Sequence, residues 1–351
     1  MSRPTAKNRA LSLFSGAGGL DIGVDKAGFK TVCSIEADVH CAATLRRNAR
    51  KKTIWQVDVR AICPERTLEV LGIQRGDVSL LYGGPPCQPF SQIGKRAGLK
   101  DARGSLIFEM VRFARELRPA AILIEQVPTF LRTCLTSGKP LLEDLSDTFS
   151  DLGYDLHANI LNTAHYGVPQ LRRRAIIVCV PTGQNFLFPP RSVRVRPVGK
   201  VLQGLPEPAK KGEESSVPNH IDVTPARDRE RISYVREGSW LSKTPNVPPD
   251  ILRKLTRKDT TKFRRLDRRL PSLTLRCGEI LYHPLENRYI TPREAARIQG
   301  FPDNHVLLGP IRGRTGQVRD LDQHRQVANA VPPPLAKAVA KSIGGSLCLF
   351  K

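Results

Sequence analysis

A cysteine in a rigid, glycine- and proline-rich segment is the first residue that could do covalent chemistry. Cys87 lies within Gly83-Gly84-Pro85-Pro86-Cys87-Gln88-Pro89-Phe90-Ser91, directly after the apolar run Leu80–Tyr82. A thiolate is a good nucleophile, and the end of a predicted strand favours a reacting group. A small buried hydrophobic residue is the usual alternative for a lone cysteine, but the flanking prolines argue against it here.

A carboxyl group ends a neighbouring apolar run. Glu125 follows Ala121-Ile122-Leu123-Ile124, and the carboxyl ends of parallel strands meet at one edge of a sheet. Glu125 is therefore expected to face the same crevice as Cys87. Burial there would raise its pKa, so that it could hold a proton or donate it to a ring nitrogen. A loop carboxylate paired with an arginine is the alternative.

Two further segments are candidate contacts to a polyanion. Residues 92–104 are punctuated by glycine and are basic, which is typical of a mobile lid. The polar side chains of this lid include Gln92, Lys95 and Arg96. Later, Gln170, Arg172 and Arg174 alternate along a predicted strand. Their spacing places them on one face, where they would contact a phosphate or a base, unless that face is simply a solvated edge.

A glycine cluster after the first apolar run predicts a nucleotide-like pocket. Phe14 is followed by Ser15-Gly16-Ala17-Gly18-Gly19 and then by a helical pattern, which allows a tight turn and close approach of a ligand to free N–H groups. Glu36, about 20 residues on, could bind ribose hydroxyls. Asp58, after the third predicted strand, could accept from an exocyclic amine. Together with Phe14 they describe an adenosine pocket, although each acid singly also fits an exposed loop.

Short apolar runs alternate with helical patterns through the first 180 residues. The predicted strands are 10–14, 31–35, 53–57, 78–82, 120–124, 155–161 and 174–180. The predicted helices between them are 20–27, 39–48, 106–117 and 140–152. This alternation is typical of an α/β fold with a doubly wound, Rossmann-like mixed sheet.

A length of 351 residues predicts about two domains. Residues 1–181 form the expected catalytic and cofactor-binding domain. The stretch 182–275 is rich in Pro, Arg and Ser without a sustained period, and predicts a smaller, irregular domain. Residues 276–351 are expected to return to the first domain, with a short helix at 292–298 and a C-terminal helix at 334–343 packing on it.

The charge of the chain favours nucleic acid as a partner. The net charge is +23, and residues 191–269 alone carry 20 basic against 10 acidic side chains. Such an excess attracts a polyanion and releases its counterions. It also exceeds the magnitude of about 2–8 that solubility requires of a small domain, so a merely solvated surface is the weaker interpretation.

Several classes of protein are excluded by composition. No apolar run approaches the roughly 20 residues of a spanning helix, and the basic N-terminus leads into no signal-type stretch. The eight cysteines include no Cys-x-x-Cys pair, which argues against a disulfide scaffold and against structural zinc. We expect a soluble, cytoplasmic protein without a metal and without a membrane partner.

The order of these motifs resembles the DNA (cytosine-5) methyltransferase family of the prokaryotic restriction–modification type, over nearly the whole chain. The motifs run from Phe14-Ser15-Gly16-Ala17-Gly18-Gly19 through Gly84–Ser91, Glu125-Gln126-Val127 and Gln170–Arg174 to Arg288–Pro302 and Gln326–Pro332. The resemblance implies the S-adenosylmethionine-dependent methyltransferase fold. It also implies methylation of carbon 5 of a flipped cytosine in a specific duplex DNA sequence.

The resemblance assigns roles to individual residues. Cys87 would be the nucleophile, Glu125 and Arg174 would grip the cytosine, and Arg172 would support the active site. S-adenosylmethionine, which leaves as S-adenosylhomocysteine, would be the cofactor. Its contacts would be Phe14 on the adenine, Glu36 on the ribose, Asp58 on the adenine amine, and Gly16, Gly18, Gly19, Pro86 and Asn329.

The resemblance also implies partners. Double-stranded DNA would be contacted by Gln92, Lys95, Arg96, Gln170, Arg264 and Arg265, and the stretch 182–275 would be the target-recognition region. The expected protein is a bacterial, nucleoid-associated monomer, with a cognate restriction endonuclease as a candidate partner. A tRNA cytosine-5 methyltransferase and a catalytically silent DNA-binding protein are the alternatives.

The chain departs from the family pattern at three positions. Gln126 stands where the family usually has Asn, Ser12 where it usually has Asp, and Ala328 where Gly is common. None of these departures removes a proposed reacting group.

Overall fold

The structure, a computed structural model, describes residues 8–49, 51–86, 106–135, 137–191, 194–253, 263–311 and 320–349. The chain forms two compact units. The first unit comprises Met1–Asn162, Arg173–Arg191 and Pro333–Lys351, and the second comprises Thr163–Arg172 and Ser192–Pro332. Residues 276–332, expected to return to the first domain, thus belong to the second unit by their contacts, and only the last segment belongs to the first.

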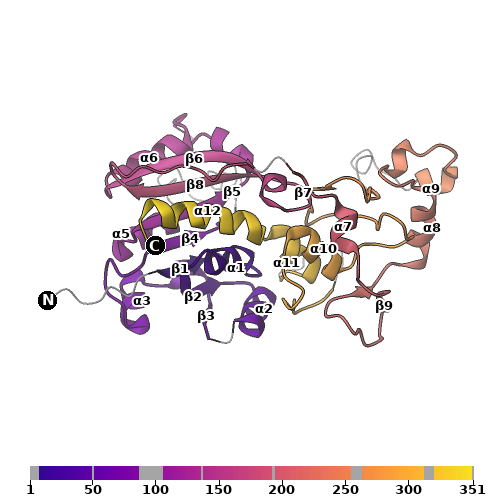
Figure 1. Ribbon diagram of the computed structural model, residues 1–351, viewed down its shortest axis with the longest axis horizontal. Coiled ribbons are helices and arrows are strands. Elements are labelled where there is room, and N and C mark those ends of the chain that lie inside the picture. Colours follow the sequence, from indigo (N-terminus) through magenta and orange to yellow (C-terminus); the bar gives the residue numbers. More distant parts are fainter. Residues whose placement is uncertain are drawn as a thin grey trace. The chain divides into compact units, whose positions relative to one another are not determined.

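A seven-stranded sheet forms the centre of the first unit, in the order β3-β2-β1-β4-β5-β8-β6 (Figure 1). Its strands are β1 (Arg9–Leu13), β2 (Lys30–Glu36), β3 (Thr53–Gln56), β4 (Leu80–Gly83), β5 (Ala121–Gln126), β6 (Tyr154–Asn162) and β8 (Arg173–Pro181). Strands β1 to β5 are parallel, whereas β8 pairs antiparallel with both β5 and β6. The predicted doubly wound mixed sheet is confirmed.

Helices cover both faces of this sheet. They are α1 (Gly19–Lys26), α2 (Val39–Asn48), α3 (Pro64–Leu71), α5 (Ile107–Leu117), α6 (Leu141–Ser150) and α12 (Pro333–Ser346). Because side chains alternate along a strand, Leu11 and Leu13 enter one core with α3, α5 and α6. Ser12, between them, faces α1 and hydrogen-bonds to Asp21.

The C-terminal helix α12 packs against α1 within the first unit (Figure 1). The approach is close at Gly23, where an added Cβ would lie 2.3 Å from the Ala336 Cβ and 2.5 Å from the Pro333 carbonyl oxygen. Glycine is therefore required at this crossing for steric reasons.

The second unit has little regular structure. Its strands are β7 (Gln170–Leu171) paired parallel with β11 (Ser272–Leu273), and β9 (Ala209–Lys210) paired parallel with β10 (Ile221–Asp222). Its helices are α7 (Val198–Leu202), α8 (Ala226–Tyr234), α9 (Pro249–Arg253), α10 (Pro292–Gln299) and α11 (Gln323–Asn329). Helix α8 was not expected, because Ile232 is its single buried hydrophobic residue and gives no apolar period.

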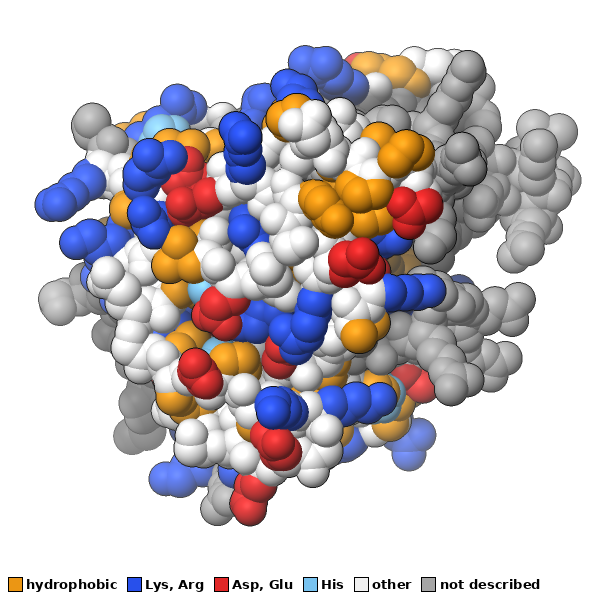
Figure 2. All heavy atoms as spheres, turned by 90° about the vertical axis from the view of Figure 1, so that its right-hand side faces the viewer, with side chains coloured by type: hydrophobic (Ala, Val, Ile, Leu, Met, Phe, Trp, Pro, Cys, Tyr) orange, Lys and Arg blue, Asp and Glu red, His pale blue; other side chains and the backbone are white. Residues whose placement is uncertain are grey.

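An apolar cluster stabilises part of this unit. Ile232, Val235 and Leu241 pack with Tyr282 and Tyr289, whose rings stack 5.8 Å apart. Outside this cluster, lysine and arginine side chains spread over the face seen in Figure 2, with carboxylates between them. Among the helices of the described ranges, none has the length and the apolar character that a membrane span requires.

Candidate active site

The strand order creates a switch point between β1 and β4. The chain leaves β1 through α1 toward β2 on one side, whereas β4 and β5 extend the sheet on the other side. Ligands of open α/β sheets bind at the carboxyl ends of the strands at such a point. Phe14 follows β1 and Gly84 follows β4, so both predicted motifs begin here. Cys87, Gln92, Lys95 and Arg96 lie outside the described residues.

The turn after β1 has an unusual backbone. Phe14 has φ 54°, Gly16 φ 53° and Gly18 φ 82°. Glycine adopts this left-handed region freely, but an aromatic residue rarely does, and such conformations concentrate at functional sites. Gly18 caps α1, and an added Cβ would lie 2.9 Å from the Leu45 Cδ2 atom. Phe14 is half-buried.

Glu36 connects the end of β2 to this glycine turn. Its carboxylate accepts hydrogen bonds from the Gly16 N–H at 2.6 Å and from the Asp38 N–H at 2.8 Å. Burial raises the pKa of Glu36, and these N–H donors oppose the rise. The predicted ribose-binding acid therefore lies against the predicted glycine turn.

Asp58 follows β3 and is more exposed. It caps a short 3₁₀ helix (Val59–Ala61) by accepting from the Arg60 N–H. The Arg60 guanidinium also donates to it, at 3.0 Å from Nε and 2.5 Å from Nη2. This hydrogen bond lowers the pKa of Asp58, so the carboxylate is ionised and ready to accept.

The buried carboxylate of Asp21 stabilises the glycine turn through hydrogen bonds to serine hydroxyls. Asp21, on α1, accepts from Ser12 at 2.7 Å and from Ser34 at 2.6 Å, and Ser15 donates to Ser12 at 2.8 Å. Lys52 lies 3.3 Å from the same carboxylate. Ser12 occupies the position where the family usually has Asp, and here α1 supplies the acid instead. Sequence analysis missed Asp21, although its place in the first turn of a helix after glycine was a signal.

Glu125 and Arg174 form an ion pair at the opposite side of the switch point. Arg174 Nε lies 2.6 Å from Glu125 Oε1, and both side chains are largely buried. They meet because β8 runs antiparallel to β5, which brings the start of β8 to the carboxyl end of β5. Glu125 is thus paired with an arginine, as the alternative expected, but it lies in β5 and not in a loop.

The Glu125 carboxylate also lies beside the segment that leads to Cys87. A Cβ added at Gly84 would lie 3.2 Å from Glu125 Oε2. On the neighbouring residue, the Gln126 Nε2 donates to the Pro85 carbonyl at 2.6 Å. Gln126, although it departs from the family pattern, therefore holds the backbone that precedes the predicted nucleophile.

Gln170 and Arg172 are not the exposed row that their spacing predicted. Gln170 is fully buried and hydrogen-bonds to Gln299 and to the Leu275 N–H. Arg172 is 1% exposed and donates to the Leu275 and Ala328 carbonyls. The single strand predicted here is interrupted at Arg172, between β7 and β8. Gln170, Arg172 and Arg174 therefore do not share one face of a strand. The DNA contact expected of Gln170 is corrected to a structural role in the second unit.

The remaining predicted residues of the second unit have defined surroundings. Asn329 is exposed, and its Oδ1 accepts from the Cys277 thiol at 2.6 Å. Arg264 lies over the Trp240 ring, 5.1 Å from its centroid. Arg265 is turned toward the Glu286–Asn287 segment, where it donates to the Glu286 carbonyl at 3.2 Å and to the Asn287 side chain.

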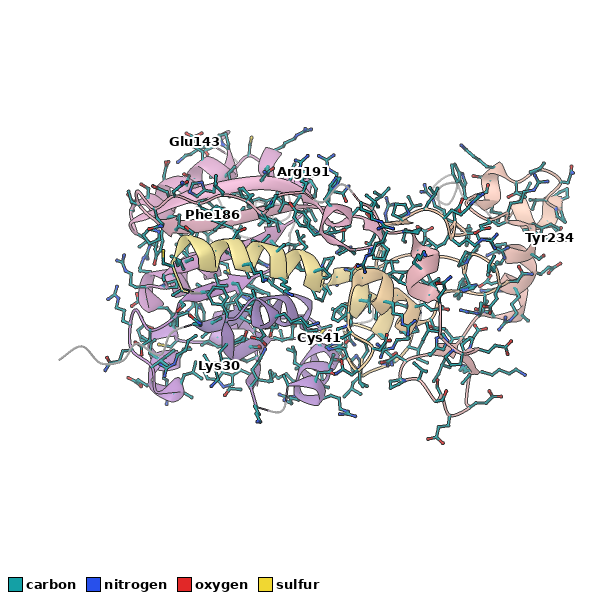
Figure 3. The ribbon with its side chains drawn as sticks, in the orientation of Figure 1. Lys30, Cys41, Glu143, Phe186, Arg191 and Tyr234 are labelled. Carbon is teal, nitrogen blue, oxygen red and sulfur yellow. The ribbon has the colours of Figure 1, made fainter. Side chains whose placement is uncertain are left out.

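The buried cysteines are poor nucleophiles. Burial raises the pKa of Cys33 to about 12, and burial also raises the pKa of Cys41 and Cys179. Cys41, on α2, is labelled in Figure 3. Their thiols stay protonated at neutral pH, and a thiol reacts as its thiolate. Within the ranges that the structure describes, no group of three or more His, Cys, Asp or Glu side chains could hold a metal ion.

Comparison with known proteins places these features in a family. The family model of the C-5 cytosine-specific DNA methylases matches residues 8–345. The chain belongs to this family. This methylase is 33% identical over 339 residues to the Type II methyltransferase M1.HphI of Haemophilus parahaemolyticus, covering 95% of the chain and 86% of the relative. It is 36% identical over 353 residues to the Type II methyltransferase M.Eco47II of Escherichia coli, covering 95% and 78%.

A solved structure supports the fold of the methylase. A prophage-encoded Escherichia coli protein, described as a DNA modification methyltransferase, superposes with a TM-score of 0.73 at 24% identity. The match covers 97% of this chain and 99% of that protein. At this identity the similarity concerns the fold alone.

Proposed function

We propose that the protein is a DNA (cytosine-5) methyltransferase that transfers a methyl group from S-adenosylmethionine to carbon 5 of a flipped cytosine in duplex DNA. The observation that carries the proposal is the buried Glu125–Arg174 pair, beside Gly84 at the carboxyl end of β5. Membership of the C-5 cytosine-specific DNA methylase family supports it.

The turn after β1 and the acids of β2 and β3 fit an adenosyl cofactor. A carboxylate has about four lone pairs, so Glu36 can accept from ribose hydroxyls while it holds the Gly16 and Asp38 N–H groups. Asp58 would accept from the adenine amine and Phe14 would contact the ring. Gly16, Gly18, Gly19, Pro86 and Asn329 would complete the site by the family resemblance. When bound, S-adenosylmethionine would supply the methyl group as an electrophile.

The residues of the chain would prepare the cytosine. The Cys87 thiolate adds to carbon 6 of the ring, and the electron pair displaced by this bond makes carbon 5 nucleophilic. Glu125, held by Arg174, hydrogen-bonds at ring nitrogen 3, where charge develops. After carbon 5 has taken the methyl group, a base removes its proton, and the returning electron pair expels Cys87. Arg172 supports this site only through the backbone that it holds.

The cytosine must leave the helix stack to reach these groups, at a cost of a few kcal/mol. We propose that the basic stretch 182–275 is the target-recognition region and that Gln92, Lys95, Arg96, Arg264 and Arg265 contact the duplex. The excess of 20 basic over 10 acidic side chains in residues 191–269 supports this assignment. We further propose a bacterial, cytoplasmic and nucleoid-associated monomer, with an endonuclease of the same site as partner.

Bisulfite sequencing of plasmid DNA from cells that express the protein tests this function. We expect cytosines within one short sequence context to resist conversion and all other cytosines to convert. Full conversion of plasmid DNA, together with tritium transfer from labelled S-adenosylmethionine to tRNA, would contradict the proposal and favour the tRNA alternative. Specific DNA binding without any methyl transfer would favour the silent binding protein.

A further inference from the structure

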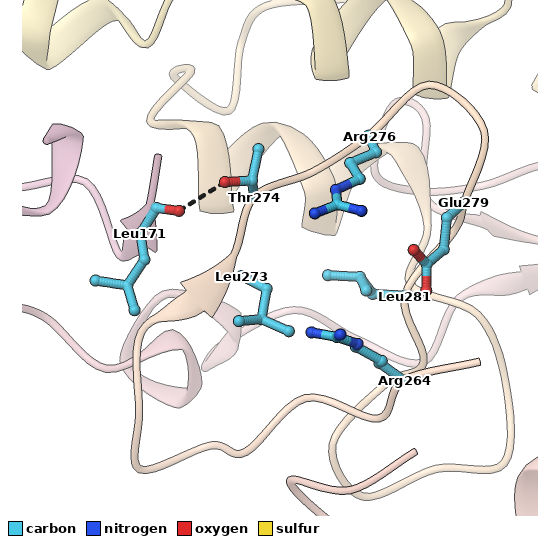
Figure 4. A pocket seen from close by; sticks show the side chains of 7 residues that line it. All are labelled: Leu171, Arg264, Leu273, Thr274, Arg276, Glu279 and Leu281. Carbon is cyan, nitrogen blue, oxygen red and sulfur yellow. Dashed lines mark hydrogen bonds between the residues drawn. The ribbon is translucent and has the colours of Figure 1, made fainter. Parts of the chain in front are cut away.

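A small pocket in the second unit has no place in the mechanism above. It lies beside the β7–β11 pair and is lined by Leu171, Leu273, Leu281, Arg264, Arg276 and Glu279 (Figure 4). Its volume is about 110 Å³, well below the roughly 300–1,000 Å³ of a small-molecule site. A pocket of this size takes one edge of a larger ligand.

The floor of the pocket is apolar and accessible. Leu171 and Leu273 are direct partners across the β7–β11 pair. The two residues are 43% and 39% exposed, whereas Leu281 beneath them is buried. The Thr274 hydroxyl donates to the Leu171 carbonyl at 2.7 Å, which fixes the two short strands together (Figure 4). Two adjacent leucines therefore stay exposed on a strongly basic unit.

The rim of the pocket is positively charged. Arg276 begins a tight turn that ends at Glu279, and its guanidinium points toward the leucines (Figure 4). The Arg276 side chain is exposed and has no hydrogen-bond or ion-pair partner within the described ranges. Arg264 lines the other side and is oriented by Trp240, over which Lys243 also lies at 4.1 Å. Two guanidinium groups and one carboxylate, that of Glu279, thus line the pocket.

A guanidinium beside an apolar surface matches the major-groove edge of a base step. Arginine pairs in two hydrogen bonds with the O6 and N7 atoms of guanine, and apolar side chains pack on the carbon 5 edge of a pyrimidine. We propose that this pocket determines sequence specificity, with Arg276 binding a guanine and Leu171 and Leu273 packing on the adjacent pyrimidine. The proposal rests on the proposed function, because it needs duplex DNA as the substrate.

The test compares methylation patterns of variants on a plasmid library read by bisulfite sequencing. For Arg276→Ala, we expect the preference for guanine at one position of the site to fall by about 10- to 100-fold. Arg276→Lys should lose most of this preference, because an ammonium lacks the rigid planar fork with which the guanidinium meets both acceptors. Arg66→Ala is the matched control: this arginine of α3 is exposed and lies outside the proposed target-recognition region, so its loss should leave the pattern unchanged.

A modified substrate gives an independent readout on the wild-type protein. Replacing that guanine by 7-deazaguanine, which lacks the N7 acceptor, should lower kcat/KM for wild type and have no effect on Arg276→Ala. Leu273→Ala should weaken discrimination at the neighbouring pyrimidine only.

Three outcomes would overturn the inference. An unchanged pattern in Arg276→Ala would do so, as would restoration of the pattern by Arg276→Lys with uniformly weaker binding, which indicates a phosphate contact. Wild-type activity that is insensitive to 7-deazaguanine at every guanine of the site would be the third. A wild-type protein that methylates no cytosine in DNA would instead refute the proposed function itself.

Discussion

Glu125 and Arg174 are far apart in the sequence but form one ion pair in the structure. Strand β5, which carries Glu125, ends at the edge of the sheet where β8, which carries Arg174, begins. Their 2.6 Å ion pair orients the carboxylate. The Arg174 guanidinium therefore fixes the position of the carboxylate that the proposed mechanism brings to ring nitrogen 3 of the cytosine.

Glu125→Gln should slow chemistry far more than it weakens cofactor binding. The amide keeps the size of the side chain but loses the charge and the ability to carry a proton to ring nitrogen 3, so we expect kcat to fall at least about 100-fold. Single-turnover methyl transfer would measure the rate, and calorimetry the affinity for S-adenosylhomocysteine. Glu143→Gln, on the exposed surface of α6 (Figure 3), is the control. Equal losses of rate and affinity would argue against the role of Glu125.

The raised pKa of Glu36 predicts how cofactor affinity depends on pH. Ribose hydroxyls donate to the ionised carboxylate, so affinity should fall as the pH is lowered through this pKa, which lies above the ordinary value of about 4.3. By linkage, Glu36 contributes to the stability of the cofactor-free protein below its unfolded pKa, and this contribution is lost as the pH rises through the folded pKa. Calorimetric titration with S-adenosylhomocysteine across the acidic range would show the effect. A pH dependence that persists in Glu36→Gln would contradict this account.

At the scale of the elements, the segment β1–turn–α1–β2 positions most of the residues proposed to bind the cofactor. Asp21 ties α1 to β1 and β2 through Ser12 and Ser34, and α12 covers α1 from outside. The close crossing of the two helices at Gly23 fixes where α1 lies, and hence where its N-terminal glycines lie.

Gly23→Ala should therefore disturb this region. The added methyl group meets backbone atoms of α12 that cannot rotate away, at 2.5 Å from Pro333 O and 2.7 Å from Lys337 N. We expect the free energy of unfolding to fall by about 1–3 kcal/mol, measured by urea denaturation. Gly345→Ala, on the partner helix α12, is the matched control: an added Cβ there meets nothing within 4 Å, so stability should hold or rise by up to about 1 kcal/mol. Equal changes in the two variants would refute the packing argument.

The strands of the first unit are the elements that the sequence predicts best. All seven strands of the sheet overlap predicted apolar runs, so their existence could be predicted, but their order in the sheet comes from the structure. The break at Arg172 could not, because the alternation of Gln170, Arg172 and Arg174 continues through it. Only the structure shows that distant carbonyls, such as that of Ala328, bind the Arg172 guanidinium. The support from Asp21 was missed for the same reason, since its partners come from β1 and β2.

At the scale of the whole molecule, composition located the basic region but not the limits of the compact units. Thr163–Arg172 and residues up to Pro332 belong to the second unit by their contacts. A short segment such as Thr163–Arg172 has no distinctive composition, because burial of Gln170 and Arg172 depends on partners more than 100 residues away. The proposed function, in contrast, depends on the order of motifs along the entire chain.

The central claim is that Cys87 bonds covalently to a flipped cytosine. Duplex DNA in which 5-fluorocytosine replaces cytosine tests it directly, because fluorine at carbon 5 prevents the proton loss that releases the enzyme. With S-adenosylmethionine present, we predict a covalent protein–DNA complex that survives denaturation and whose cross-linked peptide contains Cys87. Cys87→Ala should bind the DNA with unchanged affinity and form no such complex. The absence of a complex with the wild-type protein, or a cross-link at another residue, would contradict the account.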